Sequence, residues 1–255
     1  MIGFARRTAR RLLPSRGGAE RLFSSLALSR EEADARRSAD PGPLETLFFA
    51  NQGKLAHKWI SYLPFYDEVL APYRGKPVKM LEIGVFKGGS LELWRKYFGL
   101  EATIFGIDID PDCAAYADPP NQVRIGSQAD PEFLRRVVAE MGTPDIILDD
   151  GSHVANHQLA SFSTLFPLLK PGGLYLIEDM HTSYWPGHEG GYGRRGTAVE
   201  LTKTLIDDMH AWHHLPGARE VFASKADIGR ITIEDSIVAI RKVARLRPGH
   251  YKTGG

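Results

Sequence analysis

The chain has 255 residues, 43% of them hydrophobic, which is enough to bury the core of one sizeable globular domain. Its 32 basic residues nearly balance its 31 acidic residues, so no overall field attracts nucleic acid or an acidic surface. The single cysteine, Cys113, excludes an internal disulfide framework and a cysteine-rich zinc module. It suits a reducing compartment, and we expect a cytoplasmic protein. No apolar run approaches the ~20 residues of a membrane-spanning helix.

The first thirty residues are rich in arginine and contain one acid, Glu20. This composition is typical of a transit peptide, but it also fits an amphipathic helix on an anionic membrane surface and a flexible arm or dimer contact. These three interpretations stay open. The arginines are Arg6, Arg7, Arg10, Arg11, Arg16, Arg21 and Arg30.

A charge-rich segment, residues 29–43, then predicts a helix or linker that ends at a Pro-Gly-Pro sequence. We therefore divide the chain into an arginine-rich arm and linker, residues 1–43, and a folded domain, residues 44–255. Within the domain, residues 51–70 place Trp59, Leu63, Tyr66 and Leu70 at helical spacing, which is typical of a helix that packs against a core.

From residue 78 onward, short apolar runs alternate with amphipathic segments. This alternation implies right-handed crossovers and a parallel sheet, and the final tight strand pair implies an antiparallel edge. The predicted fold is α/β, a doubly wound, mostly parallel sheet of seven strands with a reversed last strand. The predicted strands are 78–85, 102–110, 121–127, 144–150, 174–180, 229–235 and 236–243, and the predicted helices are 88–99, 131–141, 154–170 and 196–214.

A glycine-rich turn, "EIGVFKGGS", follows the first strand of this sheet. It is neither a dinucleotide-binding G-x-G-x-x-G motif nor a phosphate-binding loop, because it lacks their spacing and the Lys-Ser/Thr ending. The turn after an acid-ended strand resembles motif I of the class I S-adenosylmethionine (SAM) methyltransferases, which share a Rossmann-like fold. The resemblance implies that Glu82, Gly84 and Gly88 belong to a SAM site.

The next two strands end in further residues that the same resemblance assigns to the cofactor. Asp108, at the end of "GIDID", stands where the family places the acid that accepts hydrogen bonds from the ribose hydroxyls. Ser127, Gln128 and Asp130 follow the third strand, where the family places contacts to adenine.

Paired acids end the fourth and fifth strands, in "IILDDGSH" and "LYLIEDMH". Because like charges repel and their burial is costly, two such pairs at one sheet edge indicate a cation between them. Asp150, Glu178 and Asp179 supply hard oxygen ligands, which suit a divalent ion such as Mg²⁺.

The segment "DDGSH…EDMHTSYWPG" resembles the catalytic part of metal-dependent sugar O-methyltransferases of macrolide and polyketide biosynthesis. The resemblance extends from about Leu44 to the C-terminus. It implies that Asp150, Glu178 and Asp179 are the metal ligands, that His153 is the general base, and that Asp149 faces the cofactor.

The implied reaction is methyl transfer from SAM to a sugar hydroxyl of a glycosylated small molecule, a secondary metabolite or a glycolipid. A metal lowers the pKa of the hydroxyl, and a neutral imidazole takes its proton. Two alternatives remain: a methyltransferase for a catechol or another vicinal diol, and an oxidoreductase similar to the cephalosporin hydroxylases. The all-oxygen ligand set argues against the iron centre of the oxidoreductase.

Residues 181–196 form a long glycine-rich and aromatic stretch after the fifth strand. Its composition is typical of a mobile lid, in which Tyr184 and Trp185 offer flat surfaces to the acceptor. The acceptor is the expected partner, together with further copies of the chain in a homo-oligomer. Nucleic acid is not expected as a partner.

Overall fold

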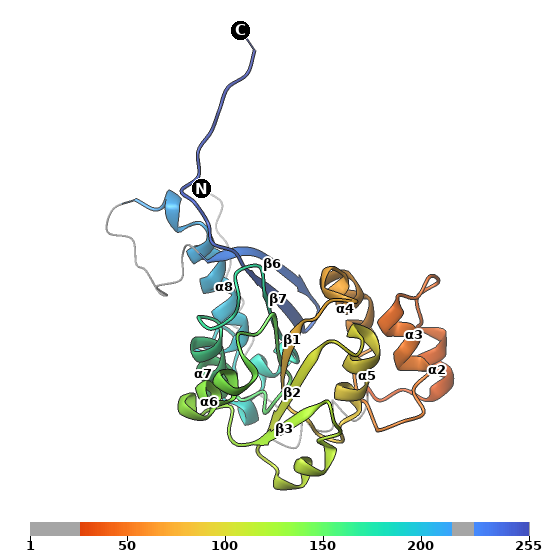
Figure 1. The fold of residues 1–255 in the computed structure, drawn as a ribbon. Helices are drawn as coiled ribbons and strands as arrows, with labels where there is room; N and C mark the ends of the chain where they lie inside the picture. Colours follow the sequence, from red (N-terminus) through yellow and green to blue (C-terminus); the bar gives the residue numbers. More distant parts are fainter. Residues whose placement is uncertain (1–25, 216–226, 255) are drawn as a thin grey trace, which may run out of the picture.

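A computed structural model describes residues 26–215 and 227–254. Its centre is a seven-stranded sheet with the order β3-β2-β1-β4-β5-β7-β6 (Figure 1). Strands β1 to β5 pair in parallel, whereas β7 runs antiparallel to both β5 and β6. This confirms the predicted doubly wound sheet with a reversed last strand. The strands are β1 (Lys79–Ile83), β2 (Thr103–Asp108), β3 (Gln122–Ile125), β4 (Ile146–Asp149), β5 (Leu174–Ile177), β6 (Ile228–Glu234) and β7 (Ile237–Lys242).

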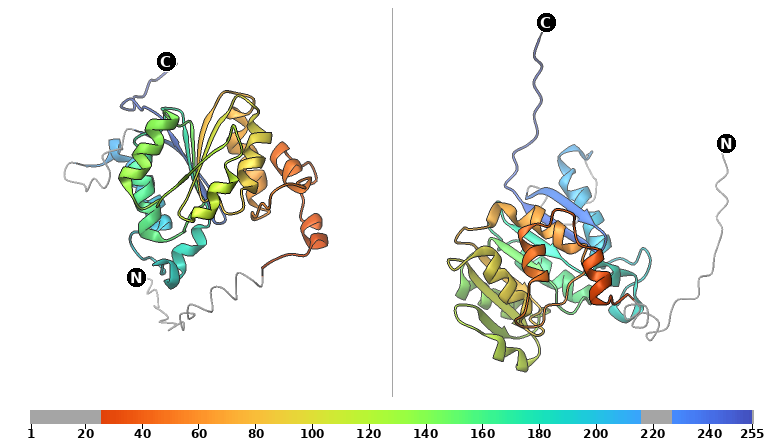
Figure 2. Two further views of the ribbon diagram at one scale, coloured as in Figure 1. Left: turned by 60° about the horizontal axis from the view of Figure 1, so that its bottom comes forward. Right: turned by 90° about the vertical axis from the view of Figure 1, so that its right-hand side faces the viewer.

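Helices cover both faces of the sheet, as the edge-on view in Figure 2 shows. Helices α6, α7 and α8 lie on one face, and α4 and α5 lie on the other, with α3 packed outside them (Figure 1). The helices are α2 (Arg30–Ala35), α3 (Pro43–Phe49), α4 (Tyr62–Leu70), α5 (Gly89–Phe98), α6 (Pro131–Met141), α7 (Ala155–Leu165) and α8 (Ala198–Met209). Short 3₁₀ helices are η1 (Ala71–Tyr73), η2 (Pro111–Tyr116), η3 (Met180–Tyr184), η4 (Pro186–His188) and η5 (Ala211–His213).

Two apolar layers hold these helices against the sheet because side chains alternate between the faces of a strand. In β1, Met80 packs with the α4 and α5 side, which contains the buried Trp94. The next residue, Leu81, packs with the α6 and α7 side, which contains Phe162. Since both faces of the sheet are buried, its central strands are almost continuously apolar, as parallel strands require.

The N-terminal part of the described chain is peripheral to this core. Ser29 caps α2 through a capping box with Glu32, and α2 has no buried residue. Leu44 is the first buried residue of the described ranges. The predicted boundary between residues 43 and 44 stays a prediction, and residues 1–25 of the predicted arm lie outside the described residues.

The helical interpretation of residues 51–70 is wrong for their first half. Asn51 accepts a hydrogen bond from the backbone N–H of Gly53, and such a local turn competes with a helix. Residues 51–61 form an irregular loop that brings Lys58 to the acids at the carboxyl ends of β4 and β5, and α4 begins only at Tyr62. We call residues 51–61 the crossing loop.

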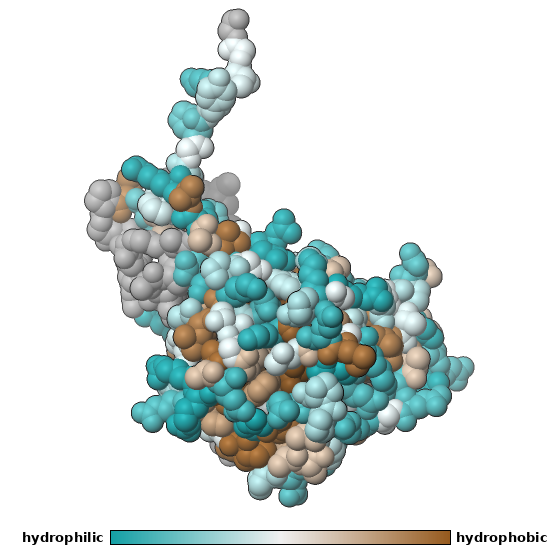
Figure 3. Space-filling model, viewed as in Figure 1, coloured by the Kyte–Doolittle hydropathy of each residue, from teal (hydrophilic) through white to brown (hydrophobic). Residues whose placement is uncertain are grey.

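The strand order reverses between β1 and β4, which are neighbours in the sheet. The loops that leave their carboxyl ends consequently run to opposite faces and open a crevice, where ligands bind in sheets of this kind. Hydrophilic residues predominate on the surface in Figure 3, with apolar patches between them. Every helix within residues 26–215 and 227–254 is too short or too polar to cross a lipid bilayer.

Candidate active site

Two adjoining cavities occupy the crevice at the carboxyl ends of the strands. The larger has a volume of about 580 Å³ and the smaller about 370 Å³. They share part of their wall, because Gly84, Phe86, Asp150 and Gly151 line both. A ligand in one cavity therefore lies next to a ligand in the other.

Glycines let the loop after β1 approach the loop after β4. Gly84 has φ of +96°, and a Cβ there would lie 2.1 Å from the carbonyl oxygen of Asp150. Gly88 has φ of +74°, and a Cβ there would lie 2.8 Å from Cβ of Tyr116. Gly88 lines neither cavity, so its contribution is the shape of the turn that starts α5.

Asp108 lines the smaller cavity at the end of β2. Its Oδ2 accepts hydrogen bonds from the backbone N–H groups of Val85 (2.8 Å) and Phe86 (3.1 Å), and its Oδ1 accepts one from Asp110 (3.0 Å). Burial alone would raise the pKa of Asp108, but these backbone donors together hold it below its ordinary value. The carboxylate is therefore charged and ties the loop after β1 to the cavity wall.

The predicted residues after β3 divide into two groups. Ser127 and Gln128 line the smaller cavity with Asp108. Asp130 does not line it, and instead caps α6 by accepting hydrogen bonds from the backbone N–H groups of Glu132 and Phe133. Asp130 thus holds the helix that follows the cavity wall.

Asp149 is fully buried behind the smaller cavity and does not line it. It accepts hydrogen bonds from Gln128 Nε2 (3.1 Å), Ser161 Oγ (2.5 Å) and Tyr175 OH (3.3 Å). Burial raises its pKa, and the hydrogen bonds act in the opposite direction. Gln128 Oε1 also accepts a hydrogen bond from the N–H of Ser152. Asp149 therefore positions Gln128 between the loop after β3 and the loop after β4.

Glu82 is likewise fully buried, within β1. Its two oxygens accept hydrogen bonds from Ser90 Oγ (2.9 Å) and Trp94 Nε1 (3.0 Å) of α5. Burial raises its pKa to about 7, and the charge of Lys58 acts against that rise. Glu82 lines neither cavity, whereas its partner Ser90 lines the larger one.

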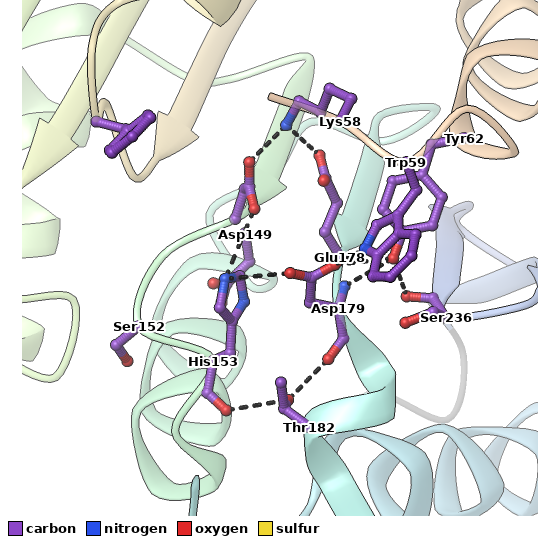
Figure 4. Close-up of polar contacts among 12 residues, drawn as sticks. Lys58, Trp59, Tyr62, Asp149, Ser152, His153, Glu178, Asp179, Thr182 and Ser236 are labelled. Carbon is purple, nitrogen blue, oxygen red and sulfur yellow. Dashed lines mark hydrogen bonds and ion pairs between the residues drawn. The ribbon is translucent and has the colours of Figure 1, made fainter. Parts of the chain in front are cut away.

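The three acids predicted to bind a metal all line the larger cavity. Figure 4 shows two of them, Glu178 and Asp179, near His153. Asp150 and Asp179 form a group with His153 in which one ligand atom of each lies within 4.8 Å of the others, so these residues could hold a metal ion. Glu178 does not join this group, although it lines the same cavity. Its carboxylate is engaged by a lysine.

That lysine, Lys58, comes from the crossing loop and is 4% exposed. Its Nζ lies 2.5 Å from Asp150 Oδ2 and 2.6 Å from Glu178 Oε1, and Tyr66 OH also donates to Glu178 Oε1. Burial opposes the charged ammonium, but the two carboxylates outweigh burial and raise the pKa of Lys58 above its ordinary value. Burial raises the pKa of Glu178, and repulsion from the carboxylate of Asp150 raises it further.

The crossing loop and α4 also hold the third acid. Trp59 Nε1 and Tyr62 OH donate to Asp179 Oδ1, at 2.9 Å and 3.0 Å. Asp179 has a φ of +54°, a conformation that costs energy in a residue other than glycine. The tertiary contacts thus fix Asp179 Oδ1 and leave Oδ2 directed toward His153.

His153 follows β4 with a φ of +56°. Its Nε2 lies 3.5 Å from Asp179 Oδ2 and 3.8 Å from Asp150 Oδ1. Its Nδ1 is buried, and no hydrogen-bond partner for it exists among the described residues. The nitrogen that faces the acids and the cavity is therefore Nε2.

Aromatic rings line the larger cavity beside the acids. Trp59 packs edge-on against His181, which in turn packs against Trp185, with ring centroids 5.6 Å and 4.7 Å apart. Trp185 lines the cavity as predicted, whereas Tyr184 lines neither cavity and stacks on Tyr192. The segment predicted as a lid contributes its aromatic surface through η3 and η4, and its mobility stays a prediction.

The sequence interpretation did not include Lys58 in the site. The available signal was a lysine within a segment expected to pack against the core, because lysine is rarely buried without an ionic partner. Its two partners lie 92 and 120 residues further along the chain, so no local pattern identifies them.

Comparison with known proteins shows that the chain is similar to methyltransferases. A family model described as a methyltransferase domain matches residues 81–180. The chain is 37% identical, over 92% of its length, to an 8-demethyl-8-(2-methoxy-alpha-L-rhamnosyl)-tetracenomycin-C 3'-O-methyltransferase of Streptomyces olivaceus, of which it covers 61%. It is 40% identical, over 67% of its length, to the mycinamicin VI 2''-O-methyltransferase of Micromonospora griseorubida, of which it covers 44%.

A solved structure has the same architecture over most of the described chain. It is MycE methyltransferase from the mycinamycin biosynthetic pathway in complex with Mg, S-adenosylhomocysteine (SAH) and mycinamycin VI. The TM-score is 0.69 at 30% identity, and the match covers 91% of this chain and 62% of MycE. The chain thus spans less than two thirds of the length of each of these relatives.

Proposed function

We propose that this chain, which contains a class I methyltransferase domain related to sugar O-methyltransferases, transfers the methyl group of SAM to a sugar hydroxyl of a glycosylated small molecule. The observation that carries the proposal is the shared wall of the two cavities. One cavity contains Asp108, which suits a ribose, and the other contains three acids and His153. A methyl donor and its acceptor would therefore meet at Gly84 and Asp150.

The smaller cavity would bind the nucleoside part of SAM. Asp108 would accept hydrogen bonds from the ribose hydroxyls, and Ser127 and Gln128 would lie beside the adenine. Gly84 would let the backbone approach the cofactor. The other predicted cofactor residues would act through the groups that they hold: Glu82 through Ser90, Gly88 through the turn before α5, Asp130 through α6, and Asp149 through Gln128.

The acids of the larger cavity fit a divalent ion such as Mg²⁺. Lys58 Nζ is the donor that Asp150 Oδ2 and Glu178 Oε1 share, so an ion in place of the ammonium would find oxygens of both acids beside Asp179. A lysine ammonium already lies between two of these acids, which indicates that the site attracts a cation. When bound, the ion would lower the pKa of a coordinated sugar hydroxyl.

His153 would accept the proton of the attacking hydroxyl at Nε2, the nitrogen that faces the cavity. The imidazolium formed in this way would be stabilised by Asp179 Oδ2 and Asp150 Oδ1. The aromatic wall of Trp59, His181 and Trp185 would present flat surfaces to the sugar or the aglycone.

A product assay tests the proposal. The protein is incubated with SAM, MgCl₂ and a panel that contains rhamnosylated polyketides, deoxysugar macrolides, their aglycones and a catechol, and products are identified by mass. We expect the gain of one methyl on glycosides alone. Methylation of the catechol in preference to every glycoside would instead support the vicinal-diol alternative, and no methylated product from a protein that binds SAH would contradict the proposal.

A homo-oligomer in the cytoplasm remains part of the proposal. Light scattering coupled to size-exclusion chromatography measures the oligomeric state, and a monomer would contradict it.

A further inference from the structure

We propose that Lys58 is an internal placeholder cation, which holds Asp150 and Glu178 together when no divalent ion is bound and competes with that ion for their oxygens. The inference rests on the metal site in the proposed function and goes beyond it, because it assigns a role in metal affinity to a residue of the crossing loop. Lys58 is a positioning residue in this scheme.

The first support is the position of the ammonium group. Lys58 Nζ lies 2.5 Å from Asp150 and 2.6 Å from Glu178, which are two of the three proposed metal ligands. Figure 4 shows the ammonium group directed toward Glu178. A cation bound by these carboxylates would need the same small volume between them. Because two positive charges at about 4 Å repel strongly in a partly buried site, the ammonium and a divalent ion would not occupy it together.

The second support is the way the acids are divided. Asp150, Asp179 and His153 already have ligand atoms within 4.8 Å of one another, whereas Glu178 is held toward Lys58 and Tyr66. Asp179 is fixed independently by Trp59 and Tyr62. Lys58 therefore binds Glu178, the one proposed ligand that is missing from the group of Asp150, Asp179 and His153.

The third support is charge. Three carboxylates and one ammonium leave two negative charges in a site where Lys58 and Glu178 are almost completely buried. Without Lys58, the acids would repel one another without compensation, which is costly in a buried site. The lysine keeps the acids close together until a divalent ion replaces it.

The fourth support is room for the lysine to leave. Lys58 lines the larger cavity, whose volume is about 580 Å³. The lysine side chain is a flexible four-carbon stem, and the cavity beside it offers space for the ammonium group when an ion displaces it. A placeholder must be able to leave the acids. An arginine would be less able to do so, because its planar guanidinium group would be held at both acids.

The test is Lys58→Met in the full-length chain, with Lys54→Met as the matched control. Lys54 lies in the same loop, and its Nζ pairs with the exposed Asp118 at 3.6 Å, away from the acids. Mg²⁺ affinity is measured by calorimetry in the presence of SAH and without acceptor, and thermal unfolding is measured in EDTA and in MgCl₂.

We expect Lys58→Met to bind Mg²⁺ roughly tenfold more tightly, or better, because the competing charge is gone. In EDTA its melting temperature should fall below that of the wild type, and MgCl₂ should raise it by more than in the wild type. Lys54→Met should match the wild type in both measurements.

Equal or weaker Mg²⁺ binding by Lys58→Met, with normal binding by the wild type, would overturn the placeholder role and leave the proposed function intact. If neither protein binds Mg²⁺, the metal site and the placeholder both fail. Should Lys58→Met not fold in EDTA, Lys58→Gln, which keeps a hydrogen-bond donor without the charge, is measured in the same way with the same expected gain in affinity.

Discussion

Replacement of Asp108 by Asn should weaken SAH binding while the protein stays folded. Asp108 uses both oxygens: Oδ2 accepts from Val85 and Phe86, and Oδ1 accepts from Asp110. An Asn side chain offers one carbonyl oxygen, so its NH₂ group would face at least one of these N–H donors. It would also remove the charge that the ribose hydroxyls are proposed to contact.

The magnitude follows from these contacts. A hydrogen bond to a charged group contributes about 1.5–3 kcal/mol, and each 1.4 kcal/mol is about tenfold in affinity. The Kd for SAH should therefore rise by roughly 10- to 150-fold. The loss of one backbone hydrogen bond costs about 1–3 kcal/mol, which is less than the roughly 5–15 kcal/mol of a typical domain, so the variant should remain folded.

Calorimetric titration with SAH, beside a thermal unfolding curve, measures both effects. Asp112→Asn is the matched control, because Asp112 is exposed, lies four residues away in η2 and lines neither cavity. Since the backbone donors hold the pKa of Asp108 below its ordinary value, its charge should persist and SAH affinity should not fall through its titration between pH 8 and about 5. An Asp108→Asn variant with a Kd within about twofold of the wild type would refute the assignment.

Three further predictions concern the shared wall and the acids. Removal of metal with EDTA should abolish turnover while calorimetry still detects SAH binding. Full activity in metal-free buffer would contradict the metal site. The variants Asp150→Ala, Glu178→Ala and Asp179→Ala should each lose turnover and keep SAH binding, as the EDTA-treated protein does. His153→Ala should lower kcat by about 10²–10⁴, the usual loss for a positioned acid-base group, with SAH and Mg²⁺ affinities near those of the wild type. A rate within a few-fold of the wild type would remove His153 as the base. Gly84→Ala should weaken SAH binding and lower the melting temperature, since its Cβ would lie 2.1 Å from the carbonyl oxygen of Asp150. If both values stay unchanged, the loops after β1 and β4 can move apart and the close approach is not required.

Much of the fold follows from local patterns in the sequence. The predicted helix over residues 131–141 coincides with α6, because Pro131 opens it, Asp130 caps it and Gly142 ends it. The strand ends could also be predicted from the sequence, since an apolar run that stops at an acid marks the point where a parallel strand leaves the core. Asp108, Asp150 and Asp179 were found in this way and line the cavities as expected.

The sequence did not predict which of the acids near the strand ends are buried. Glu82 and Asp149 were assigned to the cofactor together with their neighbours, and the structure places both behind the cavity walls. Both residues lie inside their strands, β1 and β4, so their side chains point to a face of the sheet. Each carboxylate therefore meets a helix that packs on that face, α5 for Glu82 and α7 for Asp149, and only the packed structure shows this.

The sequence by itself determined the order of strands and helices, the reversed last strand and the set of acids at one edge, because periodicity, caps and glycines act over a few neighbouring residues. Only the tertiary structure brought Lys58 to Asp150 and Glu178 and brought Trp59 and Tyr62 to Asp179. These contacts join residues that lie about a hundred positions apart, and they form because the crossing loop passes over the carboxyl ends of β4 and β5. A buried charge then selects its partners by distance in space, which no local pattern of residues encodes.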